Sequence, residues 1–113
     1  MAGPVTHRAV LQFQSPAPQG SVVEVHAIIR HPMESGFRRT ERGELIAANL
    51  IRRLVCRFNG KEVFRADLHP GMGADPSIRF PFRVEQAGDM ECEWLGDQGL
   101  TRTIKRALVI SQP

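Results

Sequence analysis

The chain has 113 residues, of which 42% are hydrophobic and 24% charged, and its formal net charge is +3. This length fits one domain with a modest core, and we take residues 1–113 as that domain. No apolar run approaches the ~18 residues of a membrane-spanning helix, so no membrane partner is expected. The basic residues are interleaved with acids and lack aromatic platforms, so no nucleic-acid partner is expected either.

Two strands are predicted in the first third of the chain. Residues 5–13 form the first, and the Pro- and Gly-rich residues 15–20 form a turn after it. In residues 22–29, apolar and polar side chains alternate, which is typical of a half-buried strand. His31-Pro32 ends this strand, because proline biases the preceding residue toward extended backbone and donates no ladder hydrogen bond. A loop dense in charge follows.

A β-hairpin is the clearest local signal. Residues 50–58 and 61–68 flank Asn59-Gly60, the dipeptide best suited to a two-residue turn because both positions accept positive φ. Both faces of the hairpin are partly apolar, so either a partner or loops of this chain cover the second face. The expected register pairs Arg57 with Glu62, Cys56 with Val63 and Val55 with Phe64. The first face holds Leu54, Cys56, Phe58 and Val63, and the second holds Ile51, Val55, Phe64, Ala66 and Leu68.

Three more strands are predicted in the C-terminal half, at residues 78–84, 90–94 and 100–110. Pro81 favours an edge position for the first of them, since proline cannot donate to a ladder. Met90, Cys92 and Trp94 are expected to point inward from the second. About seven short strands without a convincing helix predict an all-β fold, an antiparallel sandwich of the immunoglobulin type.

The residue types that carry chemistry do not form a recognisable catalytic pattern. The histidines lack zinc-site spacing, and the histidine and cysteine spacing of a superoxide-reductase-type iron site is absent. No serine lies in a nucleophile elbow. We therefore predict a binding or structural module that is not an enzyme and uses no cofactor. One alternative is a periplasmic metal-binding protein or electron carrier, and another is a stand-alone adhesion module. The metal-binding alternative would use copper held by His31, Met33, His69 and Met72.

The two cysteines, Cys56 and Cys92, are too few for a disulfide framework and lack metal-ligand spacing. They are either two buried thiols or, in an oxidising compartment, a bridged pair. Both lie mid-strand, where neither exposure nor a lowered thiol pKa is expected, so a reactive thiol is not predicted.

The segment His31-Pro32-Met33-Glu34-Ser35-Gly36 resembles the His-Pro-Met-Glu-(Thr/Ser)-Gly segment of the SoxZ family, a subunit of the sulfur-compound carrier in bacterial thiosulfate oxidation. The resemblance covers roughly residues 5 to 110, and a departure is Cys92, where relatives more often carry a large apolar residue. Further matching stretches are residues 45–46, 49–51, 55–56, Asn59-Gly60, 62–64, 66–68 and 91–94.

The resemblance implies the same sandwich fold and a tight heterodimer with a SoxY-like subunit. In that family, the partner bears a C-terminal arm whose cysteine carries sulfur intermediates covalently. This chain ends Val109 to Pro113 without such a tail and begins without an export signal. The resemblance therefore implies a non-catalytic subunit in the periplasm, exported with a signal-bearing partner. It also implies transient docking with other sulfur-oxidation enzymes. Self-association in the partner's absence is possible, and the sequence does not determine it.

Two groups of site residues follow from this interpretation. The first is expected to bind the partner, and the second to steer anionic sulfur adducts. The alternative for the second group is a solvated loop neutralised by neighbouring glutamates. The partner-binding residues are His31, Pro32, Met33, Glu34, Leu54, Phe58 and Val63, and the anion-steering residues are Arg38, Arg39 and Arg42.

Overall fold

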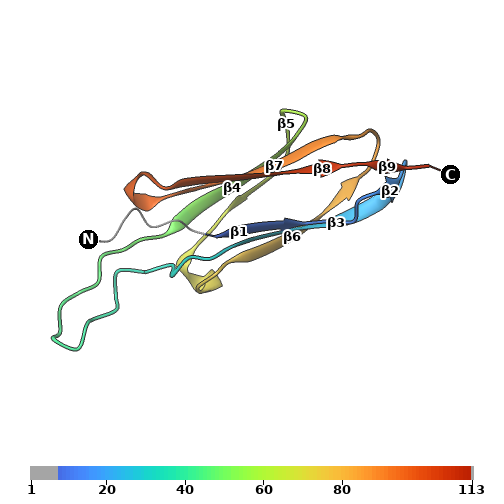
Figure 1. Ribbon diagram of the computed structural model, residues 1–113. Helices are drawn as coiled ribbons and strands as arrows, with labels where there is room; N and C mark the ends of the chain where they lie inside the picture. The colour runs from blue at the N-terminus through green and yellow to red at the C-terminus, as the bar shows by residue number, and fades with distance from the viewer. Residues whose placement is uncertain (1–7, 113) are drawn as a thin grey trace.

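The chain folds as an elongated sandwich of two antiparallel sheets, seen in a computed structural model that describes residues 8–112 (Figure 1). One sheet has the strand order β1-β3-β6 and the other β5-β4-β7-β8. The predicted all-β sandwich is confirmed. The strands are β1 (Ala9–Gln12), β2 (Ala17–Pro18), β3 (Val22–Ile29), β4 (Ile51–Phe58), β5 (Lys61–Asp67), β6 (Ser77–Arg83), β7 (Gly88–Gly96), β8 (Thr101–Leu108) and β9 (Ile110–Ser111), with short 3-10 turns η1 (Pro70–Met72) and η2 (Asp97–Gly99).

The ends of the chain depart from the predicted strands. Residues 5–7 of the first predicted strand lie outside the described residues, and the strand itself runs from Ala9 to Gln12. The expected turn at residues 15–20 contains β2, which pairs in parallel with β9. This pair lies at the end of the molecule opposite the long loop between β3 and β4 (Figure 1). This pairing joins residues 93 positions apart, Ala17 with Ile110, so no local pattern predicts it.

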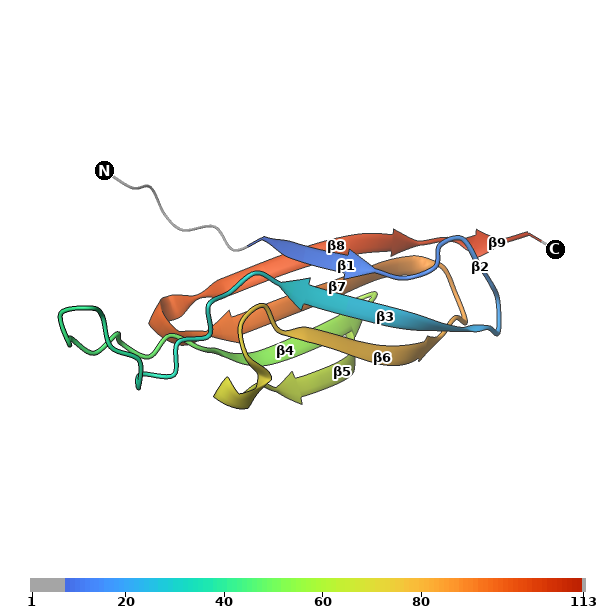
Figure 2. The same cartoon turned by 90° about the horizontal axis from the view of Figure 1, so that it is seen from below.

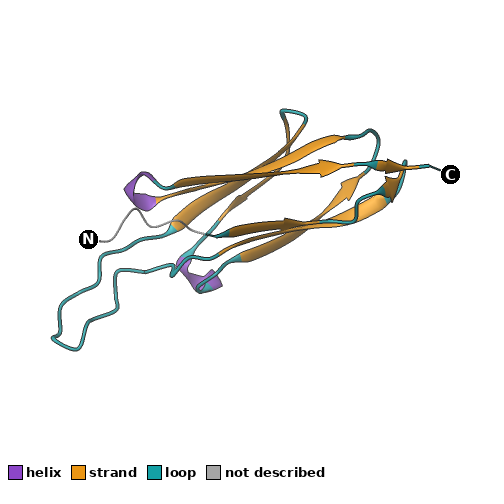
Figure 3. Cartoon of the chain, viewed as in Figure 1, coloured by secondary structure: helices purple, strands orange, loops and turns teal. Residues whose placement is uncertain are grey.

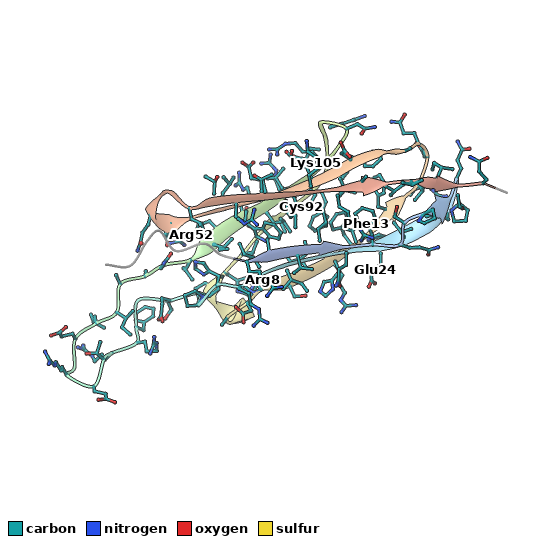
Figure 4. All side chains as sticks on the ribbon, viewed as in Figure 1. Arg8, Phe13, Glu24, Arg52, Cys92 and Lys105 are labelled. Carbon is teal, nitrogen blue, oxygen red and sulfur yellow. The ribbon has the colours of Figure 1, made fainter. Side chains whose placement is uncertain are left out.

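The core lies between the sheets, where inward side chains of alternate residues meet (Figure 4). Met90, Cys92 and Trp94 are buried there, as predicted. Phe64 of β5 stacks on Phe80 of β6 with ring centroids 4.2 Å apart, linking one sheet to the other. Strand β6 is an edge strand, which confirms the position expected from its proline.

The hairpin forms at Asn59-Gly60, both in the positive-φ region, but its register differs from the predicted one. Arg57 pairs with Glu62 as expected, whereas Cys56 pairs with Phe64 and Val55 with Arg65. The reason is a β-bulge that adds one residue to β5 at this point. The bulge turns Phe64 toward the core, where stacking on Phe80 removes apolar surface from water.

The corrected register gives the hairpin one apolar face instead of two. Ile51 and Leu68 are buried in the core, and Phe64 and Ala66 pack against it. Of the residues assigned to a second face, Val55 alone is buried outside the core cluster, opposite Arg65 and Glu93. A second apolar face is therefore no argument for a partner at this hairpin.

Between β3 and β4 the chain leaves the sandwich as a long projection, residues 34–49, which we call the arm (Figures 2 and 3). Two isolated antiparallel bridges hold it together, Glu34 with Asn49 and Arg39 with Leu45. Gly36, with φ of +93°, lies where an added Cβ would come within 3.2 Å of the Ala48 Cβ, so both backbone freedom and close approach favour glycine there.

Candidate functional site

The segment His31-Pro32-Met33 forms the first foot of the arm. His31 and Met33 are buried, and their side chains bind backbone. His31 Nδ1 accepts a hydrogen bond from the Met33 amide at 2.9 Å, and Met33 Sδ accepts one from the Ile51 amide at 3.3 Å. Met33 has φ of +53°, a strained conformation for a side chain of this size, and these contacts hold it there. The segment fixes the point where the chain leaves β3.

Asp75, in the loop before β6, clamps the same foot. Its Oδ1 accepts a hydrogen bond from the His31 amide at 2.8 Å, and its own amide donates to the His31 carbonyl at 2.8 Å. An ion pair joins its other carboxylate oxygen to Arg30 at 3.4 Å. Asp75 therefore ties the loop before β6 to the end of β3.

Asp97, in η2, holds the second foot of the arm, Leu50, in the same way. Leu50 is the residue at which the arm joins β4. The Asp97 Oδ2 accepts a hydrogen bond from the Leu50 amide at 3.0 Å, and the Asp97 amide donates to the Leu50 carbonyl at 2.8 Å. The guanidinium of Arg52 contacts both of its oxygens, at 2.9 and 3.1 Å. Arg52, followed by the Leu50 amide, lowers the pKa of Asp97, and Asp97 in turn raises the pKa of Arg52.

The three arginines predicted to steer anions have different surroundings. Arg38 pairs with Glu34, which lowers the pKa of that carboxyl. Arg39 donates a hydrogen bond to the Gly43 carbonyl at 2.7 Å, across the turn at the arm's tip. Arg42 is exposed at the tip. The arm also carries Glu34, Glu41 and Glu44, so its three arginines are matched by three glutamates and its formal net charge is zero. The steering role stays a prediction.

Phe37 and Leu45 give the arm an apolar surface that the sequence interpretation missed. They are 87% and 58% exposed, in a segment whose other side chains point largely to solvent (Figure 4). The sequence did contain a signal for this surface, since the aromatic residue Phe37 stands directly before a run of charged residues. Exposed large apolar side chains on a projecting segment are typical of a contact surface.

The residues predicted to bind a partner divide into buried and exposed sets. Leu54 and Phe58 are buried in this chain's own core, and His31 and Met33 hold the first foot. Pro32 is exposed, and Glu34 is half-buried at the arm's base. Val63, 39% exposed, borders a shallow hollow between β5 and β6. The lining residues are Phe58, Lys61, Val63, Phe82, Arg83, Glu85 and Gln86.

The described residues offer little for metal chemistry. Across residues 8–112, no group of three or more His, Cys, Asp or Glu side chains lies close enough to hold a metal ion. Of the residues in the copper alternative, His31 Nδ1 and Met33 Sδ each accept a hydrogen bond from a backbone amide. Within the same part of the chain, no helix has the length and apolarity to cross a membrane.

Comparison with known protein families shows to which family this chain belongs. Residues 11–106 match the family described as sulphur oxidation protein SoxZ, a span that runs from β1 into β8 and includes the whole arm and both clamps. The chain belongs to the SoxZ family. The resemblance read from the His-Pro-Met-Glu-Ser-Gly segment is thereby confirmed, and the chain is placed among subunits of the sulfur-oxidation system.

Solved structures share the fold with the SoxZ sandwich at low identity. A superoxide reductase (neelaredoxin) from Ignicoccus hospitalis is 14% identical with a TM-score of 0.72, covering 91% of this chain and 80% of that one. A putative superoxide reductase from Thermotoga maritima is 10% identical with a TM-score of 0.68, covering 92% and 86%. A hypothetical protein from Pyrococcus horikoshii is 16% identical with a TM-score of 0.59, covering 88% and 84%. Among curated proteins, no sequence matches this chain.

At these identities the likeness concerns the fold alone. It shows that a sandwich of this shape occurs in superoxide reductases and in a SoxZ chain, and it assigns no iron site here.

Proposed function

We propose that this chain is the non-catalytic, scaffolding subunit of a heterodimeric sulfur-compound carrier in thiosulfate oxidation. Its partner is a SoxY-like subunit whose C-terminal cysteine carries the covalent sulfur intermediates. The observation that carries the proposal is the family match over residues 11–106.

The chain's own thiols support a role without covalent chemistry. Cys56 and Cys92 are completely buried in the core. The Cys92 thiol and burial raise the pKa of Cys56, which leaves little thiolate for attack on a sulfur compound. A scaffold that leaves sulfur transfer to its partner has no use for an accessible thiol.

The arm is the proposed partner surface. An isolated two-stranded ribbon is marginally stable in water, and this one exposes Phe37 and Leu45. Covering these side chains would remove apolar surface from water and order the ribbon. Pro32 and Glu34, at the arm's base, stay in the proposal as exposed or half-exposed contacts. Val63 stays as a separate exposed contact near the β4–β5 turn, away from the arm, whereas Leu54 and Phe58 are buried in the core.

We place the heterodimer in the periplasm, exported with the signal-bearing partner and visited transiently by other sulfur-oxidation enzymes. Both parts of this proposal follow from the family resemblance alone. Fractionation of cells that express both subunits tests the location. The two chains are expected together in the periplasmic fraction, and retention of this chain in the cytoplasm in the partner's presence would contradict it.

The partner proposal is tested by coexpressing this chain with the neighbouring SoxY-like subunit and purifying through a tag on the partner. An equimolar complex is expected. Phe37→Ser should weaken the complex at least about tenfold, since a buried aromatic anchor is worth more than 1.4 kcal/mol. The matched control is Val22→Ser, an exposed apolar residue on the sandwich, which should bind normally. A stable monomer that ignores the partner would contradict the proposal.

A further inference from the structure

Cys56 and Cys92 lie directly opposite each other on the neighbouring strands β4 and β7. Both side chains point into the core and are completely buried, and their Sγ atoms are 2.8 Å apart (Cys92 is labelled in Figure 4). The next inward residue on β7 is Trp94, opposite Leu54. The pair is thus enclosed by large apolar side chains and held by the central strands of the four-stranded sheet.

The backbone already has the spacing of a disulfide. Residues directly opposite in an antiparallel ladder have Cα atoms about 4.5–5.5 Å apart, within the roughly 4.4–6.8 Å that a disulfide spans. Closing the sulfur separation from 2.8 Å to a bond of about 2.05 Å requires a movement of less than about 1 Å, which side-chain rotation supplies. The sheet therefore places the two sulfur atoms at a separation from which a disulfide can form without movement of the backbone.

We propose that Cys56 and Cys92 form a cross-strand disulfide when the chain folds in the presence of a disulfide oxidant. One cysteine thiolate attacks the oxidant's S–S bond, which breaks and releases one thiol. The second cysteine then attacks the mixed disulfide and releases the other thiol. Two electrons pass from the cysteines to the oxidant, and the two cysteine protons end on the released thiols.

The timing follows from the burial of the pair. In the folded, reduced chain, the high pKa of Cys56 and the closed core oppose attack on any external disulfide. Bridging is therefore expected while β4 and β7 are still pairing, or when they open locally. Once formed, the bond is equally shielded from reductants. This inference rests on the chain's own geometry and stands apart from the proposed function.

The test is refolding of the full chain from denaturant with a mixture of reduced and oxidised glutathione, followed by alkylation and intact-mass analysis. The wild-type chain is expected to lose two hydrogens, about 2 Da, and to take up no alkylating reagent. Cys92→Val is the matched control, which keeps a side chain of similar size and one alkylatable thiol. A folded wild-type chain that still takes up two alkylating groups overturns the proposal.

A second measurement, the stability of the bridged chain, shows whether the disulfide forms without distorting the fold. The bond joins residues 36 positions apart, so the bridged chain should have a folded-to-unfolded ratio at least about tenfold higher than the reduced chain in urea titration. Slow alkylation of the reduced folded chain, compared with rapid alkylation in denaturant, is also expected. A bridged chain that is less stable than the reduced one contradicts the claim that the sheet holds the pair in bonding geometry.

Discussion

His31 and Asp75 exchange two hydrogen bonds across 44 residues of sequence, amide to carboxylate and amide to carbonyl. Leu50 and Asp97 repeat the same exchange across 47 residues. Each foot of the arm is therefore held by one aspartate from a separate loop. The family segment at the first foot acts on the conformation of the chain, because its polar and sulfur atoms bind backbone amides.

The clamp at the first foot predicts a specific stability loss. Asp75→Ala leaves the part-buried His31 amide without its carboxylate acceptor and should destabilise the fold by about 1–3 kcal/mol. Asp75→Asn keeps an acceptor and tolerates the positive φ of this residue, so it should cost less. Urea unfolding measures both.

The control for Asp75 is Asp67→Ala, which removes an exposed carboxylate paired with Arg53 on the sandwich. Its expected cost is about 0–1 kcal/mol, as for other exposed ion pairs. Equal losses for Asp75→Ala and Asp67→Ala would show that the backbone hydrogen bonds of Asp75 contribute nothing beyond a surface charge.

The second clamp predicts a pH dependence. The pKa of Asp97 is lowered in the folded chain by Arg52 first and the Leu50 amide second. A carboxyl with a depressed folded pKa stabilises the fold above its unfolded pKa, about 3.9, and this contribution is lost as the pH falls through the folded value. Wild type should therefore be more stable than Asp97→Asn near neutral pH, with the difference shrinking below about pH 4.

The partner variant Arg52→Gln completes a double-mutant cycle for this ion pair. The two single changes should be non-additive near neutral pH, because either one alone breaks the Arg52–Asp97 contact. Urea unfolding at several pH values provides the data. Strict additivity at every pH would show that the two side chains contribute no coupling energy to the fold.

The bulged register of the hairpin predicts unequal roles for two adjacent residues. Phe64→Ala loses the stack on Phe80 and leaves a void at the core's edge, so it should cost about 2–4 kcal/mol. Val63→Ala trims a side chain that is 39% exposed and should cost less than about 1 kcal/mol. Chemical unfolding of both variants distinguishes this register from the unbulged one, in which Val63 would be the more costly to lose.

The arginines of the arm give a prediction about rate. Replacing Arg38, Arg39 and Arg42 together by Gln should slow the reconstituted pathway and flatten its dependence on salt, because the sulfur adducts proposed for the partner would be anionic. Turnover at several ionic strengths is the measurement. The control replaces the same number of arginines on the sandwich. Unchanged rates in the arm variant would contradict the steering role. The control residues are Arg53, Arg65 and Arg79.

Local patterns in the sequence were sufficient for the sandwich and for much of its layout. Alternation placed Met90, Cys92 and Trp94 in the core, and the missing N–H of Pro81 placed its strand at an edge. The bulge at β5 was missed because it is decided by the stacking of Phe64 on a strand of the other sheet. The expected cross-strand pairs within one hairpin give no information about a contact with a strand of the other sheet.

The clamps were missed for a related reason. Asp75 and Asp97 sit in turns, where aspartate commonly bonds its own neighbours. Their partners, His31 and Leu50, are 44 and 47 residues away in sequence, and only the folded sheets bring them together. The family segment was correctly singled out, and its conformational role became clear from the atoms that its side chains bind.

In the proposed carrier, sulfur is attached to the partner and not to this chain. The most direct test of this proposal is intact-mass analysis of both subunits of the purified complex after turnover with thiosulfate and the other pathway enzymes. Sulfur adducts are expected on the partner's cysteine, while this chain gains no sulfur and retains the mass of its reduced or bridged form. A stoichiometric sulfur adduct on Cys56 or Cys92 would contradict the proposal.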